Sequence, residues 1–307
     1  MSRAEYTYDA MGRILRKAQV YKDANNARKT VVTAAYTYYP NGNWESMAYP
    51  NGVTAYYTYY ADNRLHTLAN MRGDTYLNTF NYAYNGAGNM TTKLELKGTT
   101  TYSYDAVGRL ESVTEPDGKA TQYAFDAAGN RLTETVEFNN SVTITQYNYN
   151  NQGRLTSSVK TSDDAIRKTG YCYDNNGSQT SNLVSCISAP TGNAVFGVSQ
   201  AGSGAGGDIT FEINRYDAFG RLTSVQNDNY IANYEYNADG LWISKEVIAG
   251  GAASFTKFLY EGGLVTLELD GDGNQTAYNV YGSVSVISRT TAQGVDYYLY
   301  NGRGDVA

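Results

Sequence analysis

Few residues in this chain of 307 residues have the types that catalysis or metal binding requires. A catalytic triad needs a histidine beside a nucleophile and an orienting acid. The single histidine, His66, follows Leu65 inside a repeated segment, which favours a strand residue at the surface. One histidine and two cysteines also cannot supply the four ligands of a tetrahedral zinc site. The sequence therefore predicts a protein that is not an enzyme and binds no metal.

The two cysteines, Cys172 and Cys186, are close enough in the sequence for a disulfide to close a short loop. In the chain-entropy description such a bridge stabilises the folded state by about 3 kcal/mol. Neither cysteine has a basic neighbour that would indicate a reactive thiol. An extracellular location favours the bridge and a cytosolic one disfavours it. The sequence leaves the pairing of these cysteines open.

Two further segments match ligand-binding motifs in part. Residues 202–207 have the glycine spacing of the dinucleotide fingerprint, but residues 208–213 alternate like a strand where the fingerprint requires a helix. Residues 270–274 begin like a calcium loop. Gln275 then stands at the position that requires glycine, and Tyr281 at the position of the bidentate glutamate. We therefore expect no cofactor, and a hairpin turn at residues 270–274.

The elements that position these residues are indicated by a tyrosine-rich motif, seen most clearly in residues 102–110. Tyr102 and Tyr104 are two residues apart, so they face the same side of a strand. Asp105 and Gly108 hold the first and fourth positions of a four-residue turn, where a type I turn favours aspartate and glycine. Arg109 then begins the return strand. The motif predicts a β-hairpin with its own turn chemistry.

Copies of this motif recur along the chain with a period of about 20–25 residues, which indicates a repeat architecture. Asn63 replaces the turn glycine in one copy, and asparagine tolerates the left-handed backbone next best. The last copy includes Arg303-Gly304-Asp305, an integrin-binding tripeptide that here falls at a turn. The residues predicted to build the turns are Tyr8, Asp9, Gly12, Arg13, Tyr104, Asp105, Gly108, Arg109, Tyr149, Gly153, Arg154, Tyr216, Asp217, Gly220 and Arg221.

The arginines that follow the turn glycines have a structural explanation. Cross-strand neighbours at the end of a hairpin lie within reach of each other. A guanidinium stacked on a tyrosine ring contributes roughly 0.5–1 kcal/mol. We expect such stacking from Arg13, Arg109, Arg154 and Arg221.

The fold class expected from these repeats is all-β, with tandem antiparallel hairpins that form a curved or spiralling sheet. No stretch keeps a 3.6-residue apolar stripe for long, so helices should be rare. We divide the chain into a hairpin array at residues 1–187, a glycine-rich insertion or hinge at 188–208, and a continuation of the array at 209–307. The open edges of such a sheet predict self-association, or capping by a terminal hairpin that folds over.

Composition limits the partners. Tyrosine dominates the aromatic residues, with 31 Tyr against 8 Phe and 2 Trp, and buried tyrosine hydroxyls need hydrogen-bond partners or water. The net charge of −6 argues against nucleic acid, which usually requires a basic face. No apolar run reaches the roughly 18 residues that span a bilayer. Residues 1–15 are polar and charged, so we expect no signal peptide and regard the chain as a fragment.

The repeated Tyr-x-Tyr-Asp-x-x-Gly-Arg-Leu motif resembles the YD repeats of the RHS family. That family includes bacterial polymorphic toxins, wall-associated proteins, the B and C subunits of Tc toxins, and the teneurins. The resemblance covers nearly the whole chain. It implies a hairpin ribbon wound into a shell or barrel-like cocoon that encloses a C-terminal toxin or other cargo polypeptide, in a secreted or cell-surface parent protein. The family's cleavage motif, Asp-Pro-x-Gly-Leu, is absent before Ala307.

Two hypotheses for function remain from this reading. The first is a non-catalytic repeat module that forms part of a β-shell for encapsulation and delivery of a C-terminal toxin. The alternative is an adhesion module that binds cell-surface carbohydrate or protein, since tyrosine and asparagine suit sugar stacking and hydrogen bonding.

Overall fold

The computed structural model describes residues 3–22, 27–162, 165–183, 212–282 and 285–306. Within these ranges the chain forms twenty-five strands and no helix, so the all-β prediction is confirmed. The chain divides into two compact units. Unit 1 comprises residues 1–117, 260–268 and 275–307, and unit 2 comprises residues 118–259 and 269–274. The predicted insertion at 188–208 lies outside the described residues, as does the glycine motif at 202–207.

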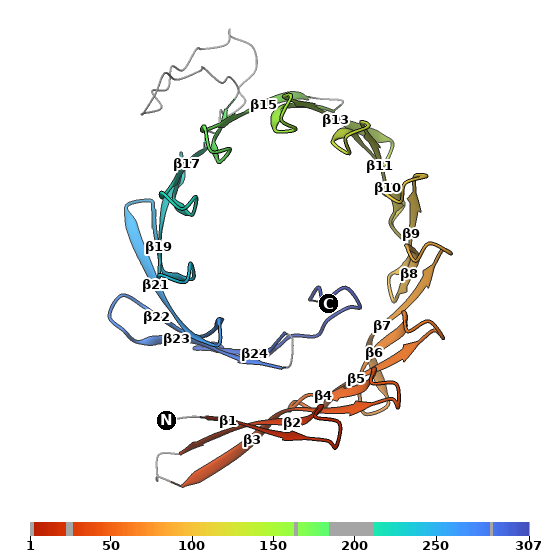
Figure 1. Cartoon of the computed structure of the whole chain (residues 1–307), viewed down its shortest axis with the longest axis vertical. Helices are drawn as coiled ribbons and strands as arrows, with labels where there is room; N and C mark the ends of the chain where they lie inside the picture. The colour runs from red at the N-terminus through yellow and green to blue at the C-terminus, as the bar shows by residue number, and fades with distance from the viewer. Residues whose placement is uncertain (1–2, 23–26, 163–164, 184–211, 283–284, 307) are drawn as a thin grey trace. The chain divides into compact units, whose positions relative to one another are not determined.

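The strands of unit 1 follow one another in chain order (Figure 1). They are β1 (Arg3–Tyr8), β2 (Ile14–Lys22), β3 (Arg28–Tyr38), β4 (Trp44–Ala48), β5 (Val53–Tyr59), β6 (Leu65–Arg72), β7 (Thr75–Tyr84), β8 (Met90–Glu95), β9 (Gly98–Tyr104), β10 (Leu110–Thr114), β22 (Leu264–Leu269), whose last residue belongs to unit 2, β23 (Gln275–Tyr281), β24 (Val286–Thr291) and β25 (Gly294–Tyr297). Consecutive strands from β1 to β10 pair antiparallel, as do β23 with β24 and β24 with β25.

Unit 2 continues the same hairpin pattern. Its strands are β11 (Ala120–Phe125), β12 (Arg131–Phe138), β13 (Ser141–Tyr149), β14 (Leu155–Ser162), β15 (Ala165–Tyr173), β16 (Gln179–Leu183), β17 (Glu212–Tyr216), β18 (Leu222–Asn227), β19 (Tyr230–Tyr236), β20 (Trp242–Ala249) and β21 (Ala252–Glu261), whose last two residues belong to unit 1. Each pairs antiparallel with the next along the chain.

Unit 1 contains a hydrophobic core on the tyrosine-bearing face of its strands. Alternation along β3, β5 and β7 places one side-chain row on this face, because successive residues of a strand point to opposite sides. Ile287 of β24 is 0% exposed and packs into the cluster. The buried members are Ala34, Tyr36, Met47, Tyr49, Val53, Ala55, Leu68, Phe80, Tyr82 and Ile287. Residues from β24 and from the segment after β25 therefore cover the face that the hairpins of unit 1 present.

No helix among the described residues combines the length and the hydropathy that a membrane crossing requires.

Candidate functional site

The repeated turns have one backbone geometry, which the turn at Asp105 illustrates. The N–H of Gly108 donates to the carbonyl of Asp105 at 3.0 Å, and the N–H of Asp105 donates to the carbonyl of Arg109 at 2.9 Å. Gly108 has φ 84°, a conformation that glycine adopts without steric cost. This is a type I turn followed by a glycine bulge. The other predicted turn glycines, Gly12, Gly153 and Gly220, have φ 79°, 72° and 74°, and Asn63 has φ 66°.

The aspartate at the first turn position holds the turn with both carboxylate oxygens. Asp105 Oδ1 accepts from the N–H groups of Val107 at 3.0 Å and Arg109 at 2.9 Å, and Oδ2 accepts from Arg109 Nε at 2.6 Å. The backbone N–H of Arg109, helped by its guanidinium, holds the pKa of Asp105 below its ordinary value. Asp9 and Asp217 have the same partners relative to Arg13 and Arg221.

In most of the described repeats, the second tyrosine of the motif joins its own repeat to the preceding one. Its hydroxyl donates to a carbonyl at or next to the start of the preceding repeat's return strand. Tyr104 reaches Met90 at 2.7 Å in this way. This bond is made by Tyr38, Tyr84, Tyr104, Tyr149, Tyr173, Tyr216, Tyr236, Tyr281 and Tyr300, among others, and the acceptors are Ile14, Leu65, Met90, Arg131, Leu155, Gln179, Leu222, Val265 and Val286. We call this series of bonds the tyrosine ladder.

The turn arginines stack on the rings of the tyrosines that form the ladder. The guanidinium of Arg221 lies 4.9 Å from the ring centre of Tyr236, and its Nη1 donates to the carbonyl of Asn237 at 3.0 Å. Arg13 lies 4.5 Å from Tyr38, and Arg154 lies 5.8 Å from Tyr173. In these three cases the stacked tyrosine therefore belongs to the following repeat, and Arg221 also lies 5.1 Å from the ring centre of Phe219 in its own turn. The reason is that neighbouring turns lie beside each other along the sheet.

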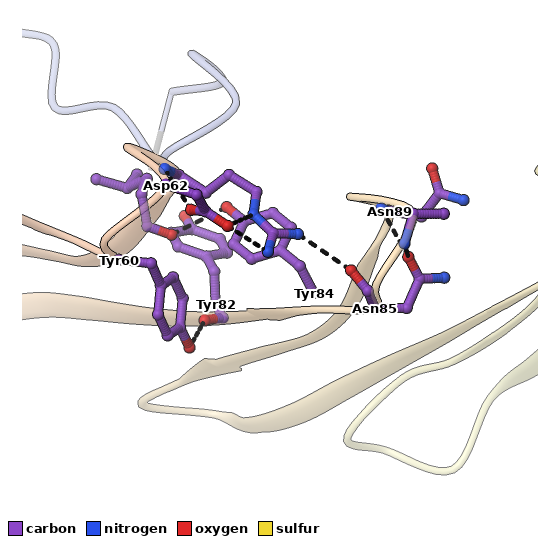
Figure 2. A network of polar contacts seen from close by, with 9 residues as sticks. Tyr60, Asp62, Tyr82, Tyr84, Asn85 and Asn89 are labelled. Carbon is purple, nitrogen blue, oxygen red and sulfur yellow. Dashed lines mark hydrogen bonds and ion pairs between the residues drawn. The ribbon is translucent and has the colours of Figure 1, made fainter.

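The ladder is seen from close by in Figure 2, where residues of two consecutive turns converge. Asp62 binds the guanidinium of Arg64, whose Nη1 donates to the carbonyl of Asn85 at 3.1 Å. The ring of Tyr84 lies 4.9 Å from the same guanidinium. The turn at residues 60–64 is thus tied to the turn at residues 85–89 by an arginine and a tyrosine.

The last turn of the chain contacts the tyrosine-bearing face of unit 1. The N–H of Gly302 donates to the hydroxyl of Tyr82 at 2.7 Å, and Arg303 lies 4.9 Å from the ring centre of Tyr102. A Cβ atom at Gly302 would lie 2.4 Å from Leu65 Cδ2 and 2.8 Å from the ring of Tyr82. Tyr82 and Gly302 are far apart in the sequence, and no sequence signal indicates their contact.

The Arg-Gly-Asp tripeptide belongs to this same turn. The N–H of Asp305 donates to Asn301 Oδ1 at 3.1 Å, and Asn301 Nδ2 donates to Asp305 Oδ2 at 3.1 Å. Gly304 has φ 86°. The aspartate and the glycine of the tripeptide therefore close the turn, while Arg303 lies over Tyr102.

Burial raises the pKa of the core tyrosines. Desolvation raises the pKa of Tyr82 to about 12, against an ordinary value of 10.0. Burial also raises the pKa of Tyr49 and of Tyr57. These phenols are neutral at physiological pH, so their hydroxyls act as hydrogen-bond donors and acceptors without charge.

The other residues considered from the sequence lie in structural contacts. His66 is exposed, and its ring lies 4.5 Å from that of Tyr60. Asp270 Oδ1 accepts from the N–H groups of Asp272 at 3.0 Å and Asn274 at 2.8 Å, as in the other turns. Within the part of the chain that the structure describes, no group of three or more His, Cys, Asp or Glu residues could hold a metal ion.

Of the two cysteines, only Cys172 belongs to the described residues. It lies in β15 between Tyr171 and Tyr173. Cys186 lies outside the described residues, so its pairing with Cys172 stays a prediction.

Comparisons with known proteins agree with the repeat pattern. The RHS Repeat family model matches residues 84–120 and 104–142. The Double-stranded DNA deaminase toxin A of Burkholderia cenocepacia (strain H111) is 50% identical to this chain over 54 residues, which are 17% of this chain and 4% of that protein. The chain thus spans a small part of this relative.

Solved structures of Tc toxin components also align. The crystal structure of TcdB2-TccC3-TEV has a TM-score of 0.40 and 15% identity, covering 93% of this chain and 17% of that one. The structure of the Photorhabdus luminescens Tc holotoxin pore with the TccC3-D651A mutation has a TM-score of 0.39 and 14% identity, covering 92% of this chain and 16% of that one.

Proposed function

Because this chain is an RHS-repeat protein, we propose that it is a non-catalytic structural module whose hairpins form part of a shell around a C-terminal toxin polypeptide. The toxin name of the relative from Burkholderia cenocepacia supports a toxin as cargo. In this proposal the longer protein that carries the chain is secreted or displayed at the cell surface. The chain itself forms part of the wall of the shell and catalyses no reaction.

The observation that carries the proposal is the tyrosine ladder. A container wall must resist sliding and separation of its strands, and backbone pairing alone specifies register weakly where side chains on both faces are partly wet. The ladder adds a side-chain bond between repeats at each rung, for example from Tyr149 to Arg131 and from Tyr236 to Leu222. Because each rung contacts only the neighbouring repeat, the wall can extend by addition of repeats.

Protease protection tests the proposal. The longer polypeptide that carries this chain is expressed with and without the repeat region, and the downstream domain is followed during limited digestion. We expect the downstream domain to survive longer with the repeats present, because protease cleavage requires an accessible, locally open chain. Equal digestion rates in the two proteins would overturn the encapsulation proposal.

A variant series sharpens this test. Tyr38→Phe, Tyr149→Phe and Tyr236→Phe remove ladder hydroxyls, and the combined variant should lose part of the protection. Tyr76→Phe is the matched control, since Tyr76 of β7 is 58% exposed and makes no ladder bond. If the control variant reduces the protection equally, the loss comes from a general decrease in stability, and the ladder has no specific role in protection.

The alternative of a glycan- or protein-binding adhesion module stays a prediction. Binding of the isolated chain to a glycan array, in the absence of any downstream domain, would favour it over encapsulation.

A further inference from the structure

Several turns of the chain contain an asparagine followed by glycine. In this dipeptide the backbone nitrogen of the glycine can attack the side-chain carbonyl carbon of the asparagine, because glycine has no Cβ to hinder the approach. The attack forms a cyclic succinimide and releases the side-chain nitrogen as ammonia, and water then opens the ring to aspartate or isoaspartate. The five dipeptides are Asn41-Gly42, Asn51-Gly52, Asn85-Gly86, Asn176-Gly177 and Asn301-Gly302.

The reaction requires a glycine N–H that can lose its proton, and in four of the five dipeptides this N–H is hydrogen-bonded. Gly42, Gly52 and Gly177 each donate it to the carbonyl three residues earlier, at 2.9–3.2 Å, which closes their own turns. The N–H of Gly302 donates to the hydroxyl of Tyr82 at 2.7 Å. A hydrogen bond opposes removal of the proton that it holds, so these four glycines are poor nucleophiles in the folded chain.

Gly86 is the exception. Its N–H has no hydrogen-bond partner among the described residues, and the residue is exposed. A Cβ built at Gly86 would have no atom within 4 Å, so water and hydroxide reach this part of the turn. The fold therefore leaves the nucleophile of the Asn85-Gly86 dipeptide available.

The turn also activates the side-chain carbonyl of Asn85. Its Oδ1 accepts from the N–H groups of Ala87 and Asn89, both at 3.0 Å (Figure 2). Negative charge develops on this oxygen during the attack, and two N–H groups at such distances stabilise it as an oxyanion hole does. Asn301 Oδ1 has the same contacts, from the N–H groups two and four residues later, at 2.8 and 3.1 Å. Asn301 differs in its bonded glycine N–H, and in a bond from its Nδ2 to Asp305 Oδ2 at 3.1 Å that holds the leaving amide.

We propose that Asn85-Gly86 is a site of spontaneous deamidation through a succinimide, and that Tyr82 protects Asn301-Gly302 from the same reaction. Solvent base removes the proton of the Gly86 nitrogen, the bond from this nitrogen to Asn85 Cγ forms, and the bond from Cγ to Nδ2 breaks as ammonia leaves with a proton. Water then adds to one of the two ring carbonyls and breaks its bond to the Gly86 nitrogen. The inference does not depend on encapsulation.

An aspartate at position 85 fits the turn. Asp126 holds the same turn position, four residues before Asn130 as Asn85 is before Asn89. Its Oδ1 accepts from the N–H of Asn130 and its Oδ2 from Asn130 Nδ2, both at 2.8 Å. Asn89 has the same two donor groups, and Arg64 Nη1, which donates to the Asn85 carbonyl at 3.1 Å, brings a positive charge close to the new carboxylate. Isoaspartate would instead lengthen the backbone of the turn by one atom.

Peptide mapping by mass spectrometry tests the proposal. The full chain is incubated at mildly alkaline pH, quenched in acid and digested, and the conversion of amide to acid is followed at each of the five asparagines. A sample unfolded in urea is followed in parallel and gives the rates without the fold. We expect the folded chain to convert Asn85 about fivefold faster than Asn301, the effect of one hydrogen bond. The unfolded chain should convert the two at similar rates.

Two variants assign the protection to Tyr82. Tyr82→Phe removes the hydroxyl that accepts from the Gly302 N–H, and it should raise the Asn301 rate about threefold. Tyr84→Phe is the matched control, because it removes a hydroxyl of the same strand that is bonded to the Leu65 carbonyl. The control should leave the Asn301 rate unchanged. Circular dichroism checks that both variants are folded.

Three outcomes would overturn the proposal. The first is a folded wild-type chain in which Asn85 converts no faster than Asn301. The second is an unchanged Asn301 rate in a Tyr82→Phe variant that is folded. The third is equal acceleration at Asn301 by Tyr82→Phe and Tyr84→Phe, which would assign the effect to a general loss of stability.

Discussion

The hydroxyl of Tyr38 donates a 2.8 Å hydrogen bond to the carbonyl of Ile14, which is the first residue of β2. Tyr38 is the last residue of β3, the strand that pairs with β2. The bond therefore ties the end of one strand to the beginning of its neighbour. A register slip by one residue would turn the tyrosine to the opposite face of the sheet and break this bond. The ladder thus specifies the register of strand pairing, which backbone pairing alone specifies only weakly.

Removing one ladder hydroxyl should reduce stability measurably. Tyr38→Phe keeps the ring and its contact with Arg13 but leaves the Ile14 carbonyl without this donor. We expect the free energy of unfolding to fall by about 1 kcal/mol, measured by urea denaturation. Tyr8→Phe is the control, because Tyr8 is exposed and lacks a ladder acceptor; its effect should stay within about 0.5 kcal/mol. Equal losses in the two variants would contradict the ladder.

Gly302→Ala should detach the last turn from the tyrosine-bearing face. A Cβ at this position meets Leu65 Cδ2 at 2.4 Å and the ring of Tyr82 at 2.8 Å. Tyr82 is 2% exposed and has little room to move. Overpacking of this kind costs about 1–3 kcal/mol. Amide exchange of residues 298–305 should accelerate while exchange in β11 to β15 stays unchanged, as followed by mass spectrometry.

The matched control for this substitution is Gly86→Ala. Gly86 holds the same position in its turn, after Asn85 as Gly302 follows Asn301. A Cβ at Gly86 would have no atom within 4 Å. Faster exchange of residues 298–305 in this control, or none in Gly302→Ala, would show that the Tyr82 contact does not hold the turn.

The hairpins could be predicted from the sequence because their signals are local. Asp105, Gly108 and Arg109 determine the turn through contacts within four residues. The ladder acceptors could not be assigned in the same way. Whether Arg13 stacks within its own hairpin or on Tyr38 of the next depends on how turns lie side by side, which spacing alone does not give. The Gly302 contact with Tyr82 depends on tertiary packing, and Gly86 shows that glycine at this turn position carries no such signal.

Acid should destabilise the turns through their aspartates. The pKa values of Asp9, Asp105 and Asp217 are lowered in the folded state, first by the backbone N–H of Arg13, Arg109 and Arg221 respectively. A lowered folded pKa gives a stability contribution that is present above the unfolded value of 3.8 and is lost as the pH falls through the folded value. Urea denaturation between neutral pH and pH values below 3.8 should show this decline.

Asp105→Asn isolates the contribution of one carboxylate. Asn150 occupies the same turn position, and its Oδ1 accepts from the N–H groups of Gln152 and Arg154 at 3.0 Å. The amide side chain of the variant should likewise keep the backbone bonds while losing the charge. We expect a smaller decline of stability in acid than in the wild type. An unchanged decline in this variant would mean that the charge of Asp105 does not contribute.

High pH should also destabilise the protein, through ionisation of Tyr82. Burial raises the pKa of its phenol to about 12, from an ordinary value of 10.0. A raised folded pKa gives stability that is fully present below the unfolded value and is lost as the pH rises through the folded value. The loss should therefore begin near pH 10 and continue to about pH 12. The tyrosinate absorbance of the wild type minus that of Tyr82→Phe should contain a step near pH 12, provided that circular dichroism shows both proteins folded at that pH. A step centred at the ordinary value in the folded protein would mean that Tyr82 is solvated, and that the last turn does not cover it.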